Sequence, residues 1–133
     1  MREVPLRVVH QGDRTLAFVP VHVEGEGPFM FALDTGASVS VVDDDVADRA
    51  GLERTGEKSA VSGILGTGRV PVARVEQWRL GDVRLDPGLV TVIDLDVPGS
   101  PGMIQGLLGS DVLSDFGSVT VDYGDGVLRL PAR

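Results

Sequence analysis

The chain has 133 residues, of which 42% are hydrophobic, and 12 Lys and Arg against 20 Asp and Glu give a formal net charge of −8. This length predicts a single domain over residues 1–133, and zero Cys excludes disulfides, thiolate metal sites and a Cys nucleophile. Lys58 and eleven scattered Arg argue against nucleic acid or an anionic membrane as a partner, because neutralising phosphates requires clustered basic side chains.

No segment near the amino end has the pattern of a secretory signal, and no apolar run approaches the roughly 20 residues of a membrane helix. We therefore expect a soluble chain, either cytoplasmic or of a compartment that the sequence leaves open. The residues could also be part of a longer or membrane-anchored protein.

Short Val-rich stretches between turn signals predict a mostly antiparallel all-β domain, with one or two short helices. An additional amino-terminal hairpin is expected over residues 1–16. The expected strands are residues 4–9, 15–24, 28–33, 70–80, 83–85, 89–93, 118–122 and 127–130.

Two segments have helix start and stop signals. Residues 43–50 begin with acidic side chains and are followed by Gly51. Residues 110–116 have Ser110 as the expected N-cap and Gly117 just beyond their end. Both helices are therefore expected to be short.

A continuously apolar stretch over residues 29–33 predicts a buried strand, and it leads directly into Asp34-Thr35-Gly36. An unpaired buried carboxylate is costly, so Asp34 either forms an Asx-type turn or is kept for its chemistry. The triplet alone does not decide between these readings.

The flanking residues point to a family. The segment from Asp34 to Ser38, followed by residues 39–42, resembles the active-site segment of the retropepsin-like aspartic proteases. A second motif, Leu107-Leu108-Gly109, resembles that family's apolar pair before a Gly, and residues 60–70 lie where the family has its flap. The flap residues implied by this match are Gly63, Ile64, Leu65 and Gly66.

The resemblance implies a closed, barrel-like single lobe that forms its active site as a homodimer. Asp34 from each copy would activate water for hydrolysis of an extended polypeptide with hydrophobic residues beside the cut. Thr35 would bond across the dimer, Gly36 would permit close backbone approach, and Ala37 would line the cleft. The resemblance implies no cofactor and no metal.

Other acidic residues are weaker candidates for chemistry. Asp111 could be an intrachain partner of Asp34, but it lies in the first turn of an expected helix, where a negative charge is favourable in any case. Residues 43–45 with Asp48 resemble a cation site but lack its usual spacing, which favours a solvated helix start.

Two further kinds of site are disfavoured by their residue patterns. Gly63, Gly66 and Gly68 do not match a phosphate-binding loop, and His10 and His22 lack a third zinc ligand.

A weakly active or inactive module for dimerisation or peptide binding remains the alternative function, since a fold does not guarantee chemistry. A third possibility is a monomeric form that assembles only on command or only within a larger chain.

Overall fold

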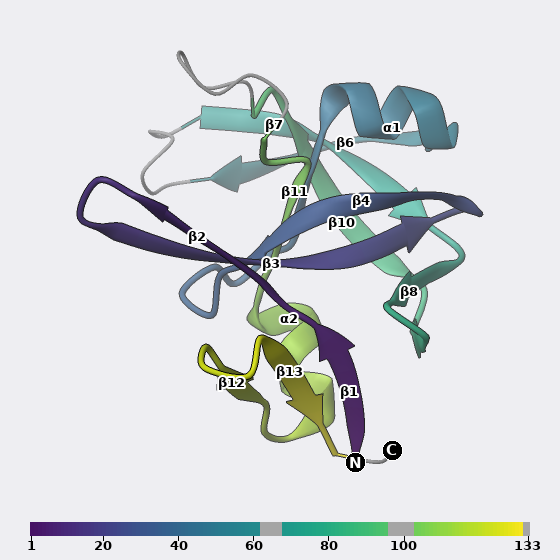
Figure 1. The fold of residues 1–133 in the computed structure, drawn as a ribbon. Helices are drawn as coiled ribbons and strands as arrows, with labels where there is room; N and C mark the ends of the chain where they lie inside the picture. Colours follow the sequence, from purple (N-terminus) through teal and green to yellow (C-terminus); the bar gives the residue numbers. More distant parts are fainter. Residues whose placement is uncertain (62–67, 96–102, 132–133) are drawn as a thin grey trace.

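The computed structural model describes residues 1–61, 68–95 and 103–131 of the chain (Figure 1). The first strands are β1 (Arg2–Pro5), β2 (Arg7–Gln11), β3 (Arg14–Val23), β4 (Glu26–Leu33), β5 (Val41–Asp43), β6 (Arg54–Val61) and β7 (Gly68–Val75). The remaining strands are β8 (Trp78–Leu80), β9 (Val83–Leu85), β10 (Gly88–Ile93), β11 (Gly106–Leu108), β12 (Thr120–Asp122) and β13 (Val127–Leu130). The helices are α1 (Asp44–Ala50) and α2 (Ser110–Leu113), which continues into the 3-10 turn η1 (Ser114–Phe116). The expected class, mostly strand with two short helices, is confirmed.

Within the described residues the strands form two sheets. The larger sheet has the order β6-β7-β10-β5-β11-β4-β3-β8-β9, with β2 also paired to β3, and the smaller sheet has the order β1-β13-β12. Figure 1 shows the smaller sheet and α2 below the larger sheet, with the start of β1 beside the end of β13. Strands β2 and β3 form a hairpin that turns at Gly12, and β1 belongs to the smaller sheet.

Two expected strands are each divided in the structure. The stretch 4–9 is split at Leu6, whose backbone N–H donates to the carbonyl of Gly126 (2.9 Å), so the chain leaves the smaller sheet there and enters the larger one. The stretch 70–80 is split between Val75 and Trp78, and its second part pairs with β3 instead of β10. Strands β5 and β6 were not expected. Strand β5 forms by pairing with the distant strands β10 and β11, and β6 pairs with β7, the next strand along the chain.

The centre of the larger sheet brings together three segments that are far apart in the sequence. Strand β11 lies between β4, to which it is parallel, and β5, to which it is antiparallel. Leu107 is opposite Ala32 on one side and Val41 on the other. This arrangement places the end of β4 and the end of β11 at the same edge, where the candidate site lies.

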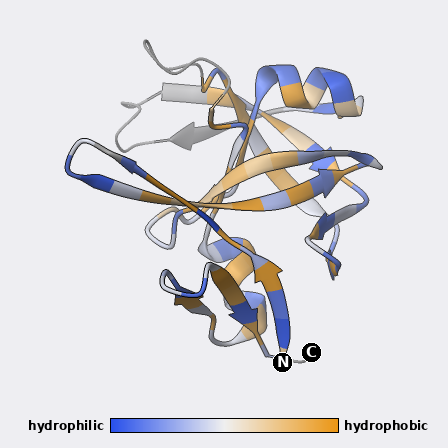
Figure 2. Cartoon of the chain, in the orientation of Figure 1, coloured by the Kyte–Doolittle hydropathy of each residue, from blue (hydrophilic) through white to orange (hydrophobic). Residues whose placement is uncertain are grey.

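Apolar side chains from both sheets form one core cluster. Figure 2 shows hydrophobic residues along the middle of β3 and β4 and hydrophilic residues at the tip of the β2–β3 hairpin. The largest fully buried side chains are Phe18, Phe29, Phe31, Leu80, Leu108, Leu128 and Leu130. Because Leu128 and Leu130 belong to the smaller sheet, the core joins the two sheets.

The first helix matches its expected limits. Asp43 is its N-cap and accepts from the backbone N–H of Asp45, and Gly51 ends it in the left-handed conformation at φ 68°. The second prediction is partly wrong: the N-cap of α2 is Gly109, and no side chain caps this helix. The Ser110 hydroxyl donates instead to the carbonyl of Ala37 (3.1 Å), a tertiary contact that a local pattern does not reveal.

No helix in the described ranges combines the length and the apolar character needed to cross a bilayer.

Candidate active site

Asp34 lies directly after β4, at the point where the strand enters an exposed turn. Its backbone N–H donates to the carbonyl of Leu108 (3.0 Å), which anchors the first residue of the turn to β11. One carboxylate oxygen, Oδ1, accepts from the N–H of Gly36 (3.2 Å), and the Asp34 carbonyl accepts from the N–H of Ala37 (3.1 Å). The Asx-type turn is therefore present, and among the described residues no hydrogen bond to Oδ2 of the half-buried carboxylate is formed.

The next residues of the triplet are at the surface. Thr35 and Gly36 are exposed, and Ala37 is half-buried. The carbonyl of Ala37 accepts both the N–H (2.8 Å) and the hydroxyl (3.1 Å) of Ser110. The turn thus presents Asp34 and Thr35 outward while its Ala37 end is tied to the segment that follows β11.

The second motif lies against this turn. Leu107 and Leu108 belong to β11, and Leu108 is fully buried. Gly109 is required by close approach: a Cβ built there would lie 2.7 Å from the carbonyl oxygen of Ala37. The sequence paired these two motifs by family resemblance, and the structure brings them into direct contact.

Asp111 does not have a free carboxylate. Its Oδ2 accepts from the N–H of Ser40 (2.9 Å), and its Oδ1 accepts from the Ser40 hydroxyl (2.7 Å) and from the N–H of Val112 (3.0 Å). Asp111 lies in the first turn of α2, as predicted. These contacts favour the structural role over an intrachain partner for Asp34.

Sequence reasoning did not single out Ser40 for this role. Its side chain is fully buried, and its Oγ accepts from the N–H of Gly109 (2.9 Å) while it donates to Asp111. The available signal was a polar residue between Val39 and Val41, in a stretch that is otherwise apolar.

The predicted flap residues Gly63, Ile64, Leu65 and Gly66 lie outside the described residues. The strands on either side, β6 and β7, pair antiparallel, and their register runs to Val61 opposite Gly68.

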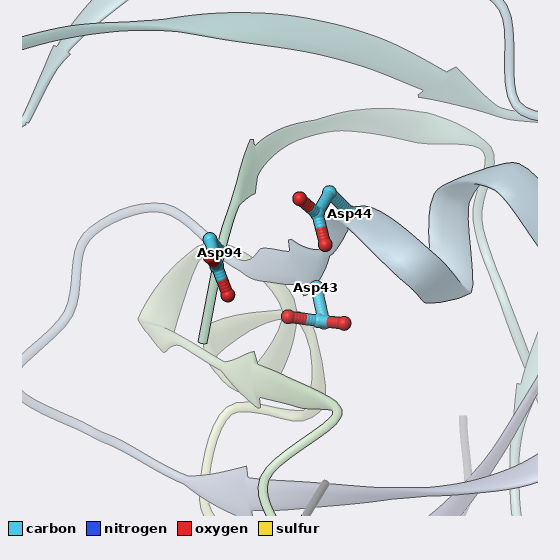
Figure 3. Close-up of side chains that lie close together, drawn as sticks. All are labelled: Asp43, Asp44 and Asp94. Atoms are coloured by element: carbon cyan, nitrogen blue, oxygen red, sulfur yellow. The ribbon is translucent and has the colours of Figure 1, made fainter. Parts of the chain in front are cut away.

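An acidic cluster lies at the start of α1, near the end of β10 (Figure 3). Carboxylate oxygens of Asp43, Asp44 and Asp94 lie within 4.8 Å of one another. Desolvation and the neighbouring charges of Asp43, Asp94 and Asp45 raise the pKa of Asp44. This is the sole group of three possible metal ligands among the described residues.

Asp43 already has a structural task in this cluster. Its Oδ2 accepts from the N–H of Asp45 (3.1 Å), and its Oδ1 accepts from the N–H of Leu95 (2.7 Å). The residue is 6% exposed, so the expectation of a fully solvated helix start is wrong for Asp43. The contact with Asp45 caps α1, and the contact with Leu95 holds the chain that follows β10.

The arrangement defines a class of protein: a mostly-β lobe in which an Asp-Thr-Gly turn is held against an apolar-apolar-Gly segment. Residues 19–112 match the family model described as aspartyl protease. The chain therefore belongs to the aspartyl protease family, of the retropepsin-like kind that the sequence resembles.

Two solved structures have the same fold. A retropepsin-like aspartic protease from Rickettsia conorii matches with a TM-score of 0.60 at 15% identity, covering 94% of this chain and 89% of that one. The retroviral protease-like domain of Ddi1 from Leishmania major matches with a TM-score of 0.56 at 18% identity, covering 85% and 86%. No curated protein sequence matches this chain.

Proposed function

We propose that this chain is an aspartic endopeptidase whose active site forms between two copies. The observation that carries the proposal is the position of Asp34: it is half-buried at the end of a core strand, in a turn anchored to β11, within a chain of the aspartyl protease family. Such a carboxylate is held in place and remains open to a partner.

The need for a second copy follows from the chemistry of carboxylates. Hydrolysis of a peptide bond by carboxylates requires one group to take a proton from water and another to protonate the carbonyl oxygen. The chain contains one Asp-Thr-Gly triplet, and the oxygens of Asp111 accept from Ser40 and Val112. A twofold axis supplies the second Asp34 most simply, because the same surface then meets itself.

Two such carboxylates would share one proton. At a separation of ~3 Å and an effective dielectric constant of ~20 they repel by about 5 kcal/mol, so the doubly charged pair is strongly disfavoured. Aspartic proteases are the established example of this effect. The charged Asp34 would act as the base toward water, and the protonated Asp34 of the other copy would act as the acid.

The remaining predicted site residues would support this pair. Thr35 is exposed beside Asp34, where its hydroxyl is available to bond across a dimer, and Gly36 and Ala37 would line the cleft. Residues 63–66 would close over an extended polypeptide with hydrophobic residues flanking the cut. No metal and no cofactor is needed for this chemistry.

The smaller sheet is the candidate contact between copies. Within the described residues, β1 and β12 are its outer strands, and each has an edge without a strand partner. Unpaired edges pair readily with another chain. We propose that the copies associate through this sheet, which the two chain ends build together.

Cleavage of a denatured protein between pH 3 and 8 tests the activity. The Asp34→Asn variant should lose turnover by about a hundredfold to ten-thousandfold, because it removes the acid–base pair. The control is Asp13→Asn, an exposed carboxylate at the tip of the β2–β3 hairpin, and it should cleave like the parent. Undiminished turnover by Asp34→Asn would remove Asp34 from the mechanism.

Sedimentation at micromolar concentration tests the pairing. A dimer that persists in Asp34→Asn without cleavage agrees with the proposal. A dimer whose parent form binds peptides but cleaves none, with no response to a statine-type inhibitor, would favour the binding module instead. A monomer at every concentration, together with full activity, would contradict the two-copy site.

A further inference from the structure

The loop that carries Asp34 is joined to a single short segment at its beginning, middle and end. The N–H of Asp34 donates to Leu108, the carbonyl of Ala37 accepts from Ser110, and Ser40 contacts both Gly109 and Asp111. Loop residues 34–40 are therefore held over their whole length by residues 108–111. The last of these attachments is made by side chains.

Ser40 is the buried centre of that last attachment. Its hydroxyl accepts from the N–H of Gly109 and donates to Asp111, so one oxygen atom connects the N-cap and the first turn of α2 to the end of the loop. Its carbonyl accepts from the N–H of Thr91 on β10 (3.1 Å). A fully buried hydroxyl with both of its functions used is costly to remove, because the N–H of buried Gly109 then lacks its acceptor.

The groups around Asp111 are all donors. Its two oxygens face the N–H and the hydroxyl of Ser40 and the N–H of Val112. Asn at this position would direct an NH2 group at one of these backbone N–H donors in either orientation of the amide. Although residue 111 is exposed, its position thus calls for a carboxylate.

We propose that Ser40 and Asp111 form a positioning pair that sets the placement of Asp34 for catalysis. This inference rests on the proposed function, and it assigns to Asp111 an action through Ser40 in place of contact with substrate. Rates of such reactions respond steeply to misplacement, since a displacement of about 1 Å can cost a hundredfold. The pair therefore controls turnover more than substrate affinity.

The test compares kcat per active site, counted by titration with a tight-binding statine-type inhibitor, well below the Tm of each variant. Ser40→Ala and Asp111→Asn should each lower kcat by about tenfold to a hundredfold, with KM changed less than threefold. The matched controls are Ser114→Ala and Asp115→Asn, which alter exposed residues of η1 and should keep the parental kcat. A kcat per site within twofold of the parent, even with a lowered Tm, would overturn the proposal.

The double variant tests whether Ser40 and Asp111 affect kcat through the same contact. Because both residues act through the same contact, Ser40→Ala with Asp111→Asn should be no slower than the slower single variant. Effects on kcat that multiply would show two independent causes and would contradict a positioning pair.

A readout without catalysis separates this inference from the proposed function. The Ser110 amide, which donates to Ala37, should exchange its hydrogen faster in Ser40→Ala than in the parent, with the amides of β3 unchanged. Parental exchange at Ser110 would overturn the positioning role. A parent that cleaves nothing, combined with faster exchange in the variant, would instead reject the proposed function and keep the ordering of the loop by Ser40.

Discussion

Strands β4 and β5 of the larger sheet each lead to a carboxylate, and these two carboxylates have opposite surroundings. Asp34 follows β4, is half-buried, and uses Oδ1 for the N–H of Gly36, while no hydrogen bond to its Oδ2 occurs within residues 1–61, 68–95 and 103–131. Asp43 ends β5, is 6% exposed, and uses both oxygens for backbone N–H groups. A carboxylate whose oxygens are all occupied by the fold serves stability, and one with an oxygen to spare is available for chemistry.

The largest effect on stability is expected where the Asp34 loop touches the second motif. Gly109→Ala places a methyl group 2.7 Å from the carbonyl oxygen of Ala37, so backbone must shift. We expect the free energy of unfolding to fall by about 2–3 kcal/mol and the activity to fall with it. Urea denaturation measures the change. Gly88→Ala is the control, because no atom lies within 4 Å of its built Cβ and its unfolding should change by less than about 0.5 kcal/mol.

Replacing each of the two carboxylates with Ala tests whether Asp34 and Asp43 have different roles. Asp43→Ala removes the helix cap and the acceptor for Leu95, so the free energy of unfolding should fall by about 2 kcal/mol. Asp34→Ala should change unfolding by less than about 1 kcal/mol while it removes turnover. Urea denaturation and peptide cleavage, measured on both variants, distinguish the two roles. Equal losses of stability would show that the two strand ends do not differ as described.

The smallest effect is expected from Asp44, whose pKa is raised above its ordinary value of 3.8 mainly by desolvation and by the charge of Asp43. A raised folded-state pKa means that charging this group opposes folding, so the penalty is absent in acid and develops as the pH rises above about 4. The Asp44→Asn variant should have a higher Tm than the parent at pH 7 and the same Tm at pH 3. The exposed-site variant Asp13→Asn provides the baseline. A higher Tm of Asp44→Asn at pH 3 as well would exclude the charging of Asp44 as the cause.

Features with local signals were predictable. The apolar run before Asp34 predicts β4, and the acidic start with Gly51 at the end predicts α1 within one residue. Strand β6 was not predictable, because its residues Gly56-Glu57-Lys58 have weak strand preference and the strand forms by pairing with β7. Ser110 illustrates the same limit: its type and position suggest an N-cap, but its hydroxyl donates to Ala37.

The sequence by itself determined that this is a mostly-β chain of the retropepsin-like kind, with Asp34 as the residue to test, because strand patterns and the Asp-Thr-Gly turn depend on neighbouring residues. The tertiary structure alone decided that β11 lies between β4 and β5 and that Asp111 accepts from Ser40, 71 residues away. Those contacts arise when distant segments are packed together, and their energies depend on burial and on the direction of each hydrogen bond. The burial of these groups and the direction of their hydrogen bonds are defined only once the chain has folded.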